Sequence, residues 1–302
     1  MSLLVVGEAL VDLIVPSDGS IRAVPGGGPF NMARAAARLG ATVAFGGGIS
    51  DDAFGRRISA LLHDDGVATP LTTRHGRPTT LALAELDATG AATYYFYVDG
   101  TSAPDVTVGD LVLGPEVRVL AVGTLGLVIE PLAAAAEALV TSASDAVLVM
   151  VDPNCRPQII SDESAYRARL QRVLERADVI KVSGDDLAWL DPSSESLDAA
   201  RDLLAGGARV VLFTDGADAV RIITPVDEVV VPVPGVDVVD TVGAGDSFGG
   251  GFLAFWETGG HTREDLADLD LVRSVVERAI VVAGITCTRP GADPPFLHEL
   301  PA

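Results

Sequence analysis

An aspartate that directly follows three small residues has the clearest potential for chemistry in this sequence. The stretch DTVGAGDSFGGGF runs from Asp240 to Phe252, so Gly243, Ala244 and Gly245 precede Asp246. Apolar residues then recur at helical spacing, which predicts that the three small residues form the turn that opens a helix. The first N–H groups of a helix have no intrahelical partner, and small residues let an anion approach them closely. The stretch therefore predicts an anion-binding turn made of backbone.

Asp246 would lie beside that anion, where a carboxylate is unfavourable unless it takes part in a reaction. It is placed to accept a proton from a hydroxyl whose oxygen attacks phosphorus, while the amides of Gly243–Gly245 stabilise the charge on the transferred group. The alternative is that Asp246 only complements the helix dipole and that the glycines serve a tight turn. For an isolated G-A-G-D stretch this alternative is favoured, and other motifs must decide.

The composition excludes several function classes. The chain has 302 residues, is 48% hydrophobic and carries a formal net charge of −21 with a pI near 4.3. A basic surface for nucleic acid is therefore not expected, and Lys181 is the one lysine. Cys155 and Cys287 lack metal-ligand spacing. The amino terminus does not resemble a signal peptide, and no apolar run is long enough to span a membrane, so we expect a cytoplasmic protein.

Short apolar runs alternate with helical patterns, which is typical of βαβ units and a mostly parallel sheet. A helix that begins at Pro29 and ends at Gly40 separates the first two strands, and a second, amphipathic helix ends at Gly66. The predicted strands are Leu3–Gly7, residues 42–47, Val117–Val122, Ala146–Val151, Val179–Val182 and Val210–Thr214.

One region departs from this alternation. Residues Thr79–Val98 form short alternating runs with Ala88-Thr89-Gly90 near a turn, which indicates a hairpin, and Val11–Ala23 is a second extended stretch. We interpret both as a small antiparallel sheet beside the main one, contributed by insertions at about 11–24 and 70–100 in a single domain of residues 1–302. This sheet is either a lid that excludes water or an ordinary edge hairpin.

Taken together, the motifs resemble the ribokinase-like carbohydrate kinases of the PfkB family. DTVGAGDSFGGGF is similar to the carboxy-terminal signature of that family, and PGGGPFNMARAAARLGA (Pro25–Ala41) is similar to its amino-terminal signature. The resemblance covers nearly the whole chain in family order, and GEALVDL and VDPNCRP are most similar to fructokinases. It implies a three-layer α/β/α sandwich with a mostly parallel central sheet, a small β-sheet lid, and transfer of the γ-phosphoryl group of ATP to a primary sugar hydroxyl with Mg²⁺.

The resemblance also implies roles for individual residues. Asp246 would be the base, Gly243, Ala244 and Gly245 the anion hole, and the lid would close with Tyr95 or Tyr97. The residues that would bind the sugar are Asp12, Gly27, Gly28, Asn31, Tyr95, Tyr97, Arg156 and Asp246. Three of these have alternatives: Asn31 as a helix cap, Asp12 as a solvated acid at a strand end, and Arg156 in a structural salt bridge.

On the nucleotide side, the family pattern implies that Thr214 and Gly216 lie near ATP and that Ala283–Ala292 lines the adenine pocket. Ala283 fits helix packing equally well. The family glycine three residues after Gly216 is replaced by Ala219. Lys181 would contact phosphate or form an ion pair at a strand end. The residues carried over for the nucleotide are Lys181, Thr214, Gly216, Gly243, Gly245 and Ala283.

The family's Asn-x-x-Glu motif aligns with Ser183-Gly184-Asp185-Asp186. Asp186 would hold Mg²⁺ through water, or it is a solvated acid at a helix start. Asp240 and Val242 match positions that supply oxygens to K⁺ in some members, so activation by K⁺ is left open. Lid sheets in this family often pair between subunits, which makes a homodimer an expectation by analogy.

The residue after the FY pair selects between sugar classes. Many relatives have an arginine there, whereas this chain has Val98, and loss of a guanidinium disfavours a carboxylated sugar. The pattern therefore favours a neutral sugar, fructose before the others, with ATP as the second small-molecule partner. The alternatives are 2-keto-3-deoxygluconate, ribose or a nucleoside as acceptor, or a sugar sensor without activity, which the departures at Val98, Ser183 and Ala219 keep open.

Overall fold

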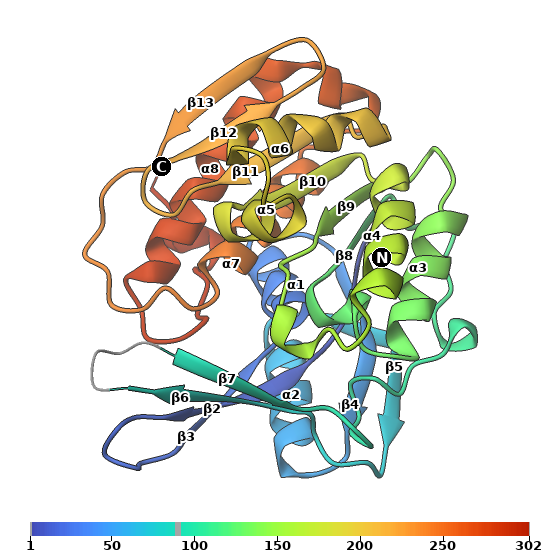
Figure 1. The fold of residues 1–302 in the computed structure, drawn as a ribbon, viewed down its shortest axis with the longest axis vertical. Coiled ribbons are helices and arrows are strands. Elements are labelled where there is room, and N and C mark those ends of the chain that lie inside the picture. Colours follow the sequence, from blue (N-terminus) through green and yellow to red (C-terminus); the bar gives the residue numbers. More distant parts are fainter. Residues whose placement is uncertain (1, 88–91, 302) are drawn as a thin grey trace.

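A nine-stranded sheet forms the centre of the protein (Figure 1). The structure is a computed structural model that describes residues 2–87 and 92–301. The strand order is β13-β12-β11-β10-β9-β8-β1-β4-β5. The strands from β11 to β5 are parallel, and β12 is antiparallel to both of its neighbours, β11 and β13. These strands are β1 (Leu3–Val6), β4 (Val43–Ser50), β5 (Ala68–His75), β8 (Val119–Gly123), β9 (Leu148–Asp152), β10 (Val179–Ser183), β11 (Val210–Thr214), β12 (Ala219–Ile223) and β13 (Glu228–Pro232).

Helices cover both faces of this sheet, which confirms the predicted α/β/α sandwich (Figure 1). One face packs against α1 (Gly28–Arg38), α2 (Ala53–Asp64), α7 (Ala244–Thr258) and α8 (Leu269–Cys287). The other packs against α3 (Leu132–Ser142), α4 (Glu163–Arg176), α5 (Gly184–Leu190) and α6 (Ser196–Asp202). None of the helices in residues 2–87 and 92–301 is both long and apolar enough to cross a membrane.

The sequence explains the burial of the central strands. All four residues of β1 are buried, because a strand with helices on both faces exposes neither row of side chains to water. The predicted strands lie where the structure has them, with differences of one to three residues at their ends. The predicted strand at Ala146–Val151 is β9, which ends at Asp152 and so carries an acid at its carboxyl end.

A second sheet, called the lid sheet here, has the order β3-β2-β6-β7 (Figure 1). Its strands are β2 (Leu10–Val15), β3 (Arg22–Gly26), β6 (Leu81–Leu86) and β7 (Ala92–Tyr97). The predicted hairpin is present as β6 and β7, but its turn at Ala88-Thr89-Gly90 lies outside the described residues. Two expectations were wrong. The sheet is mixed, because β2 and β6 are parallel, and β5, placed in the lid insertion, is an edge strand of the large sheet.

Helix α7 is wedged between α1 and α8. A Cβ on Gly250 would lie 2.6 Å from the carbonyl oxygen of Met32 in α1, and one on Gly251 would lie 3.2 Å from the Cα of Ala279 in α8. Glycines at these positions therefore let α7 contact the backbones of both neighbours. The helix that carries the predicted base is held in place along its length.

Candidate active site

The predicted site residues converge at the carboxyl ends of β1, β8 and β9. Strand β1 lies between β4 and β8, so the connections leave it in opposite directions on its two sides. In open α/β sheets, such a point of reversal leaves a crevice where ligands bind. The amino-terminal residues of α1 and α7 meet there, since Asn31 Nδ2 donates a hydrogen bond of 2.9 Å to Asp246 Oδ2.

The turn before α7 has the geometry that the G-A-G-D motif predicts. Gly243 has a φ of 77° and precedes the first helical residue, Ala244. A Cβ on Gly243 would also lie 2.4 Å from the Cβ of Ala292, so both conformation and space require glycine here. No side chain caps this helix start, and the Ala244 N–H donates to the Thr241 carbonyl oxygen at 3.2 Å. Within the described residues, the N–H groups of Gly243, Gly245 and Asp246 are the ones left available to a ligand.

Asp246 lies in the first turn of α7 and is partly buried. Burial raises the pKa of its carboxyl group, and the hydrogen bond from Asn31 and the charges of Lys181 and Arg156 oppose that rise. The helix-cap alternative for Asn31 is wrong, because Gly27 is the cap residue of α1 and Asn31 lies inside the helix. A carboxylate with a raised pKa is a stronger base than an ordinary aspartate.

Asp12 and the glycines before α1 form one wall of the crevice. A Cβ on Gly26 would lie 2.1 Å from Asp12 Oδ2, and one on Gly27, whose φ is 108°, would lie 2.6 Å from the carbonyl oxygen of Glu8. Burial raises the pKa of Asp12 to about 7, and repulsion from Asp246 adds to this effect while Arg156 opposes it. Asp12 is therefore not a solvated acid at a strand end: it lies within β2 and faces the other charged groups of the site.

Lys181 forms the ion pair that was one of its two predicted roles. Its Nζ lies 2.7 Å from Asp152 Oδ2, and the side chains are 6% and 3% exposed. The same Nζ would lie 3.2 Å from a Cβ on Gly245, so the ammonium group is next to the predicted anion hole. Burial raises the pKa of Asp152 to about 6, and Lys181 opposes that rise. The ion pair does not remove Lys181 from the neighbourhood of the predicted anion hole.

Asp186 is a buried member of the capping box of α5 rather than a solvated acid. Its Oδ2 accepts hydrogen bonds from the Ser183 N–H and Oγ, and its Oδ1 accepts one of 2.6 Å from the Cys155 N–H. Together with the bond from the Asp186 N–H to Ser183 Oγ, these form a capping box at the start of α5. Ser183 is thus the cap residue of α5, a role that an asparagine could also fill. In residues 2–87 and 92–301 no group of three or more His, Cys, Asp and Glu residues could hold a metal ion.

Arg156 is partly buried, and its Nη1 donates to the carbonyl oxygens of Asn154 and Cys155 at 3.2 and 2.9 Å. The salt-bridge alternative is wrong within the described part of the chain, where no carboxylate lies at ion-pair distance from this guanidinium. Its charge nevertheless lowers the pKa values of Asp12 and Asp246. Arg156 therefore acts electrostatically on both carboxylates, and within the described residues its donor groups are not paired to an acid.

The proposed phosphate-side residues lie at the end of β11. Thr214 Oγ1 donates to the Val182 carbonyl oxygen at 3.3 Å, and Gly216 has a φ of 55° in the exposed turn that leads to β12. Ala219 is already the first residue of β12, where it pairs with Pro232, and its φ is not positive. This strand position does not require glycine, so the departure at Ala219 leaves the turn at Gly216 intact.

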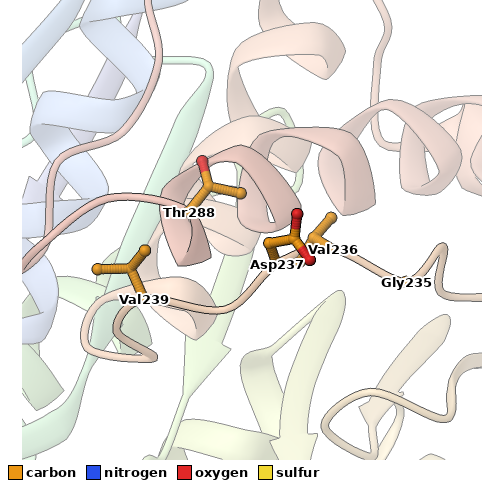
Figure 2. A pocket seen from close by; sticks show the side chains of 5 residues that line it. All are labelled: Gly235, Val236, Asp237, Val239 and Thr288. Carbon is orange, nitrogen blue, oxygen red and sulfur yellow. The ribbon is translucent and has the colours of Figure 1, made fainter.

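A pocket of about 610 Å³ lies between the segment before the G-A-G-D motif and the end of α8, lined by Gly235, Val236, Asp237, Val239 and Thr288 (Figure 2). Thr288 belongs to the segment predicted to line the adenine pocket. Ala283 does not line the pocket, because it packs against the core from α8. The lining residues before the G-A-G-D motif were missed, although their apolar, exposed run directly precedes it.

Asp240 joins the two loops that border this pocket. Its Oδ1 accepts from the Val242 N–H at 3.0 Å, and its Oδ2 accepts from the Gly291 N–H at 2.9 Å. The loop before the anion hole is thereby tied to the loop after α8. Both oxygens of the carboxylate predicted to contact K⁺ take part in these backbone bonds.

The register of the lid sheet contradicts the roles given to Tyr95 and Tyr97. Asp12 pairs with Ala82, and Ala82 pairs with Phe96, so these three side chains share one face of the sheet. Side chains alternate between faces along a strand, which places Tyr95 and Tyr97 on the opposite face from Asp12. The prediction that either closes over the sugar is therefore wrong. Tyr94 and Phe96, whose rings stack at 6.3 Å, lie on the face of Asp12.

Three polar residues of the site were missed from the sequence. Glu8 is fully buried, and its oxygens accept from the Gly28 and Gly126 N–H groups at 3.1 and 2.9 Å. Burial raises the pKa of Glu8 to about 8, against the effect of these bonds. Thr124 and Asn154 have positive φ angles of 51° and 40°. An acid that interrupts the apolar run of residues 3–11 was a signal for Glu8, whereas the sequence carries no signal for the φ of Thr124.

Comparison with known proteins identifies the family. The pfkB family carbohydrate kinase pattern matches residues 1–299. A fructokinase of Rhizobium leguminosarum bv. trifolii is 36% identical over 254 residues, which cover 82% of this chain and 77% of that protein. A fructokinase of Vibrio alginolyticus is 30% identical over 290 residues, which cover 95% of this chain and 93% of that protein.

Solved structures agree with the sequence comparison. The structure of a Xylella fastidiosa fructokinase with bound ATP has a TM-score of 0.89 and 27% identity, and covers 99% of this chain and 95% of its own. The structure of a Vibrio cholerae O395 fructokinase with bound fructose, ADP and calcium ion has a TM-score of 0.87 and 25% identity, and the match covers 97% of this chain and 94% of that chain. The chain therefore belongs to the pfkB family of carbohydrate kinases and is a sugar phosphotransferase.

Proposed function

We propose that this chain is an ATP-dependent fructokinase that transfers the γ-phosphoryl group to a primary hydroxyl of fructose. The observation that carries the proposal is the meeting of α1 and α7 at Asn31 and Asp246, next to Asp12 and the Gly27–Gly28 turn. Carboxylate and amide groups there suit a polyhydroxylated sugar, and the backbone amides at the start of α7 suit a phosphate. Fructokinases among the relatives, with ATP, ADP or fructose bound in neighbouring structures, support the same choice.

The transfer assigns a role to each group of the site. The sugar hydroxyl oxygen forms a bond to the γ-phosphorus, its proton goes to Asp246, and the bond between the γ-phosphorus and the oxygen bridging to the β-phosphate breaks to release ADP. The amides of Gly243–Gly245 and the ammonium group of Lys181 stabilise the charge of the transferred group. The raised pKa of Asp246 helps it to take the proton during bond formation.

A neutral sugar fits the charges of the crevice better than a sugar acid. Asp12 and Asp246 face the acceptor position, and Val98 stands where many relatives have an arginine. Arg156 is the one observation that favours a carboxylated acceptor such as 2-keto-3-deoxygluconate, because its guanidinium lacks an acidic partner in the described part of the chain. A riboside is a further alternative, since an aminoimidazole riboside kinase of Salmonella enterica has a TM-score of 0.83 and 26% identity.

The cations of the reaction are part of this proposal. Mg²⁺ supplies charge neutralisation to the phosphates of ATP, and it keeps several waters in such sites. Asp186 does not fit as a direct ligand, because backbone and side-chain donors already occupy both of its oxygens. We expect the phosphates and waters to hold most of the Mg²⁺ shell. Dependence on K⁺ at Asp240 and Val242 stays an expectation, to be measured by activity with K⁺ and with a bulky organic cation in its place.

A homodimer through the lid sheet is also proposed. Tyr95 and Tyr97 are 48% and 55% exposed on the face of the lid sheet opposite Asp12. Exposed aromatic side chains of this kind are common at protein interfaces. Mass measurement in solution, with Tyr95→Ser and Tyr97→Ser variants, tests whether this face joins two copies.

The proposal is tested first with a panel of acceptors in the presence of ATP and Mg²⁺. Fructose, ribose, tagatose, 2-keto-3-deoxygluconate, aminoimidazole riboside and a nucleoside are compared by kcat/KM. Fructose is expected to be phosphorylated most efficiently. Turnover of another acceptor alone would reject fructose, and no turnover of any acceptor would favour a sensor without activity.

The role of Asp246 is tested by Asp246→Asn. The amide cannot take the proton, so kcat is expected to fall by about 10²–10⁴ while the fold persists. The matched control is Asp162→Asn, because Asp162 caps α4 at the surface and asparagine caps as well as aspartate. Near-normal turnover by Asp246→Asn would remove Asp246 from the mechanism.

A further inference from the structure

Two residues with an unfavourable backbone conformation flank the crevice. Thr124 follows β8 with a φ of 51°, and Asn154 follows β9 with a φ of 40°. A β-branched residue such as threonine is rarely found with positive φ, so its surroundings must hold it there. Residues with strained backbone conformations cluster at ligand-binding and active sites. Thr124 is 8% exposed and begins the short 3₁₀ helix η2 (Thr124–Leu127).

Contacts from three strand ends fix the position of Thr124. Glu8 Oε2, after β1, accepts from the Gly126 N–H within η2 at 2.9 Å. Gly123 packs so closely on the end of β9 that a Cβ there would lie 2.0 Å from the Asp152 carbonyl oxygen. Asn154 Nδ2 donates to Thr124 Oγ1 at 3.3 Å. The amide makes this hydroxyl an acceptor, so the hydroxyl proton of Thr124 remains available for donation.

The hydroxyl of Thr124 faces the space that Gly28 leaves open. A Cβ on Gly28 would lie 2.5 Å from Thr124 Oγ1 and 3.3 Å from Asp246 Oδ1. Asp246 binds Asn31 through its other oxygen, Oδ2, and within the described residues no hydrogen bond reaches Oδ1. A donor hydroxyl and a carboxylate oxygen therefore border the same space, next to one of the two glycines that we assign to the sugar.

We propose that Thr124 is a sugar-binding residue whose hydroxyl, oriented by Asn154, donates to an oxygen of the acceptor sugar beside Asp246. This assignment rests on the proposed kinase function and adds a determinant of sugar orientation to it. A helix-capping role does not explain Thr124, because the cap residue of η2 is Gly123 and no side-chain cap bond is present. The substrate class is a polyhydroxylated sugar, since a hydroxyl donor offers nothing to an apolar ligand.

The test compares two variants. Thr124→Val keeps the β-branched shape of the side chain and the same unfavourable positive φ but removes the hydroxyl, whereas Thr124→Ser keeps the hydroxyl. Loss of one hydrogen bond to fructose is expected to raise KM for fructose about 5- to 10-fold in Thr124→Val, with KM for ATP within about 2-fold of wild type. Thr124→Ser is expected to stay within about 2-fold for both substrates. A fructose KM in Thr124→Val equal to that of wild type would overturn the proposal.

A matched control separates binding from structure. Thr79 is also buried, and its hydroxyl donates to Asp52, the cap of α2, at 2.6 Å. Thr79→Val is expected to lower the melting temperature and leave both KM values unchanged, which is the opposite pattern to Thr124→Val. If Thr124→Val does not fold, Thr124→Gly serves instead, because glycine accepts positive φ and lacks the hydroxyl. Fructose binding by Thr124→Gly as tight as wild type would overturn the proposal as well.

The two proposals fail in different ways. If wild type does not phosphorylate fructose, the proposed acceptor is wrong, and the Thr124 variants are then measured with whichever sugar of the panel is turned over. If wild type phosphorylates fructose and Thr124→Val has an unchanged KM, the fructokinase assignment stands and the role of Thr124 is rejected.

Discussion

Replacing Lys181 by methionine separates the two roles of the single lysine. Burial lowers the pKa of Lys181, but attraction and a hydrogen bond from Asp152, with further attraction from Asp186 and Asp246, raise it above its usual value. The ammonium group therefore stays charged at neutral pH. Removing one partner of a buried ion pair costs about 3–5 kcal/mol, because the other charge is left without compensation. For a chain of this size, that loss lowers the melting temperature by roughly 5–15 °C.

The double variant Lys181→Met/Asp152→Asn distinguishes stability from catalysis. It removes both charges, so most of the lost stability is expected to return. Its kcat is expected to remain about 10²-fold below that of wild type, because the positive charge beside Gly245 would still be missing when negative charge develops on the transferred group. Thermal unfolding gives the first quantity, and initial rates at saturating ATP and fructose give the second.

Either of two results would refute this reasoning. If the double variant recovered both its melting temperature and wild-type kcat, Lys181 would be only the structural partner of Asp152. If the single variant lost no stability, the premise of a costly unpaired Asp152 would fail as well. Asp152→Asn alone is the control, since it keeps the ammonium group next to Gly245 and should retain most of the turnover.

Two further predictions concern the anion hole and the sugar wall. Gly243→Ala should lower the free energy of unfolding by about 1–3 kcal/mol and raise KM for ATP, because the residue has a φ of 77° and its Cβ would contact Ala292. Gly216→Ala is the control: its φ is also positive, but no atom lies within 4 Å of its Cβ, so the loss of unfolding free energy should be smaller. Denaturant titration and kinetics measure both, and equal losses would contradict the steric explanation. The pKa of Asp12 is raised to about 7, so its carboxylate forms only as pH rises through that value, and kcat/KM for fructose should rise with it. In Asp12→Asn the rise near pH 7 should be absent, and a pH profile identical to wild type would reject Asp12 as its source.

The central sheet could be predicted because its strands are buried on both faces. Apolar runs such as that of β1 need no knowledge of their neighbours, and the helix after Gly243 is specified by small residues followed by helical spacing. The pairing of the lid sheet depends instead on contacts between distant segments. Nothing local states that β2 runs parallel to β6, so an antiparallel sheet was the natural but wrong expectation.

The same limit explains the errors at the site. The motif placed Asp246 correctly at the start of α7, because the chemistry and the turn lie in one segment. The faces of Tyr95 and Tyr97 depend on register, and a shift of one residue reverses the face of every side chain in a strand. The capping box of Asp186 and the positive φ of Thr124 arise from neighbours that fold against them, which a linear pattern does not reveal.

Because α7 is packed tightly between α1 and α8, the anion-binding turn at its start is already in place before the substrates bind. Gly250 contacts the backbone of α1 and Gly251 contacts that of α8, so close packing prevents α7 from sliding or rotating when nucleotide binds. The dipoles at its first turn already point where negative charge will accumulate, so little energy is spent on reorientation during the chemical step. Any rearrangement that accompanies turnover must then come from segments outside this three-helix block.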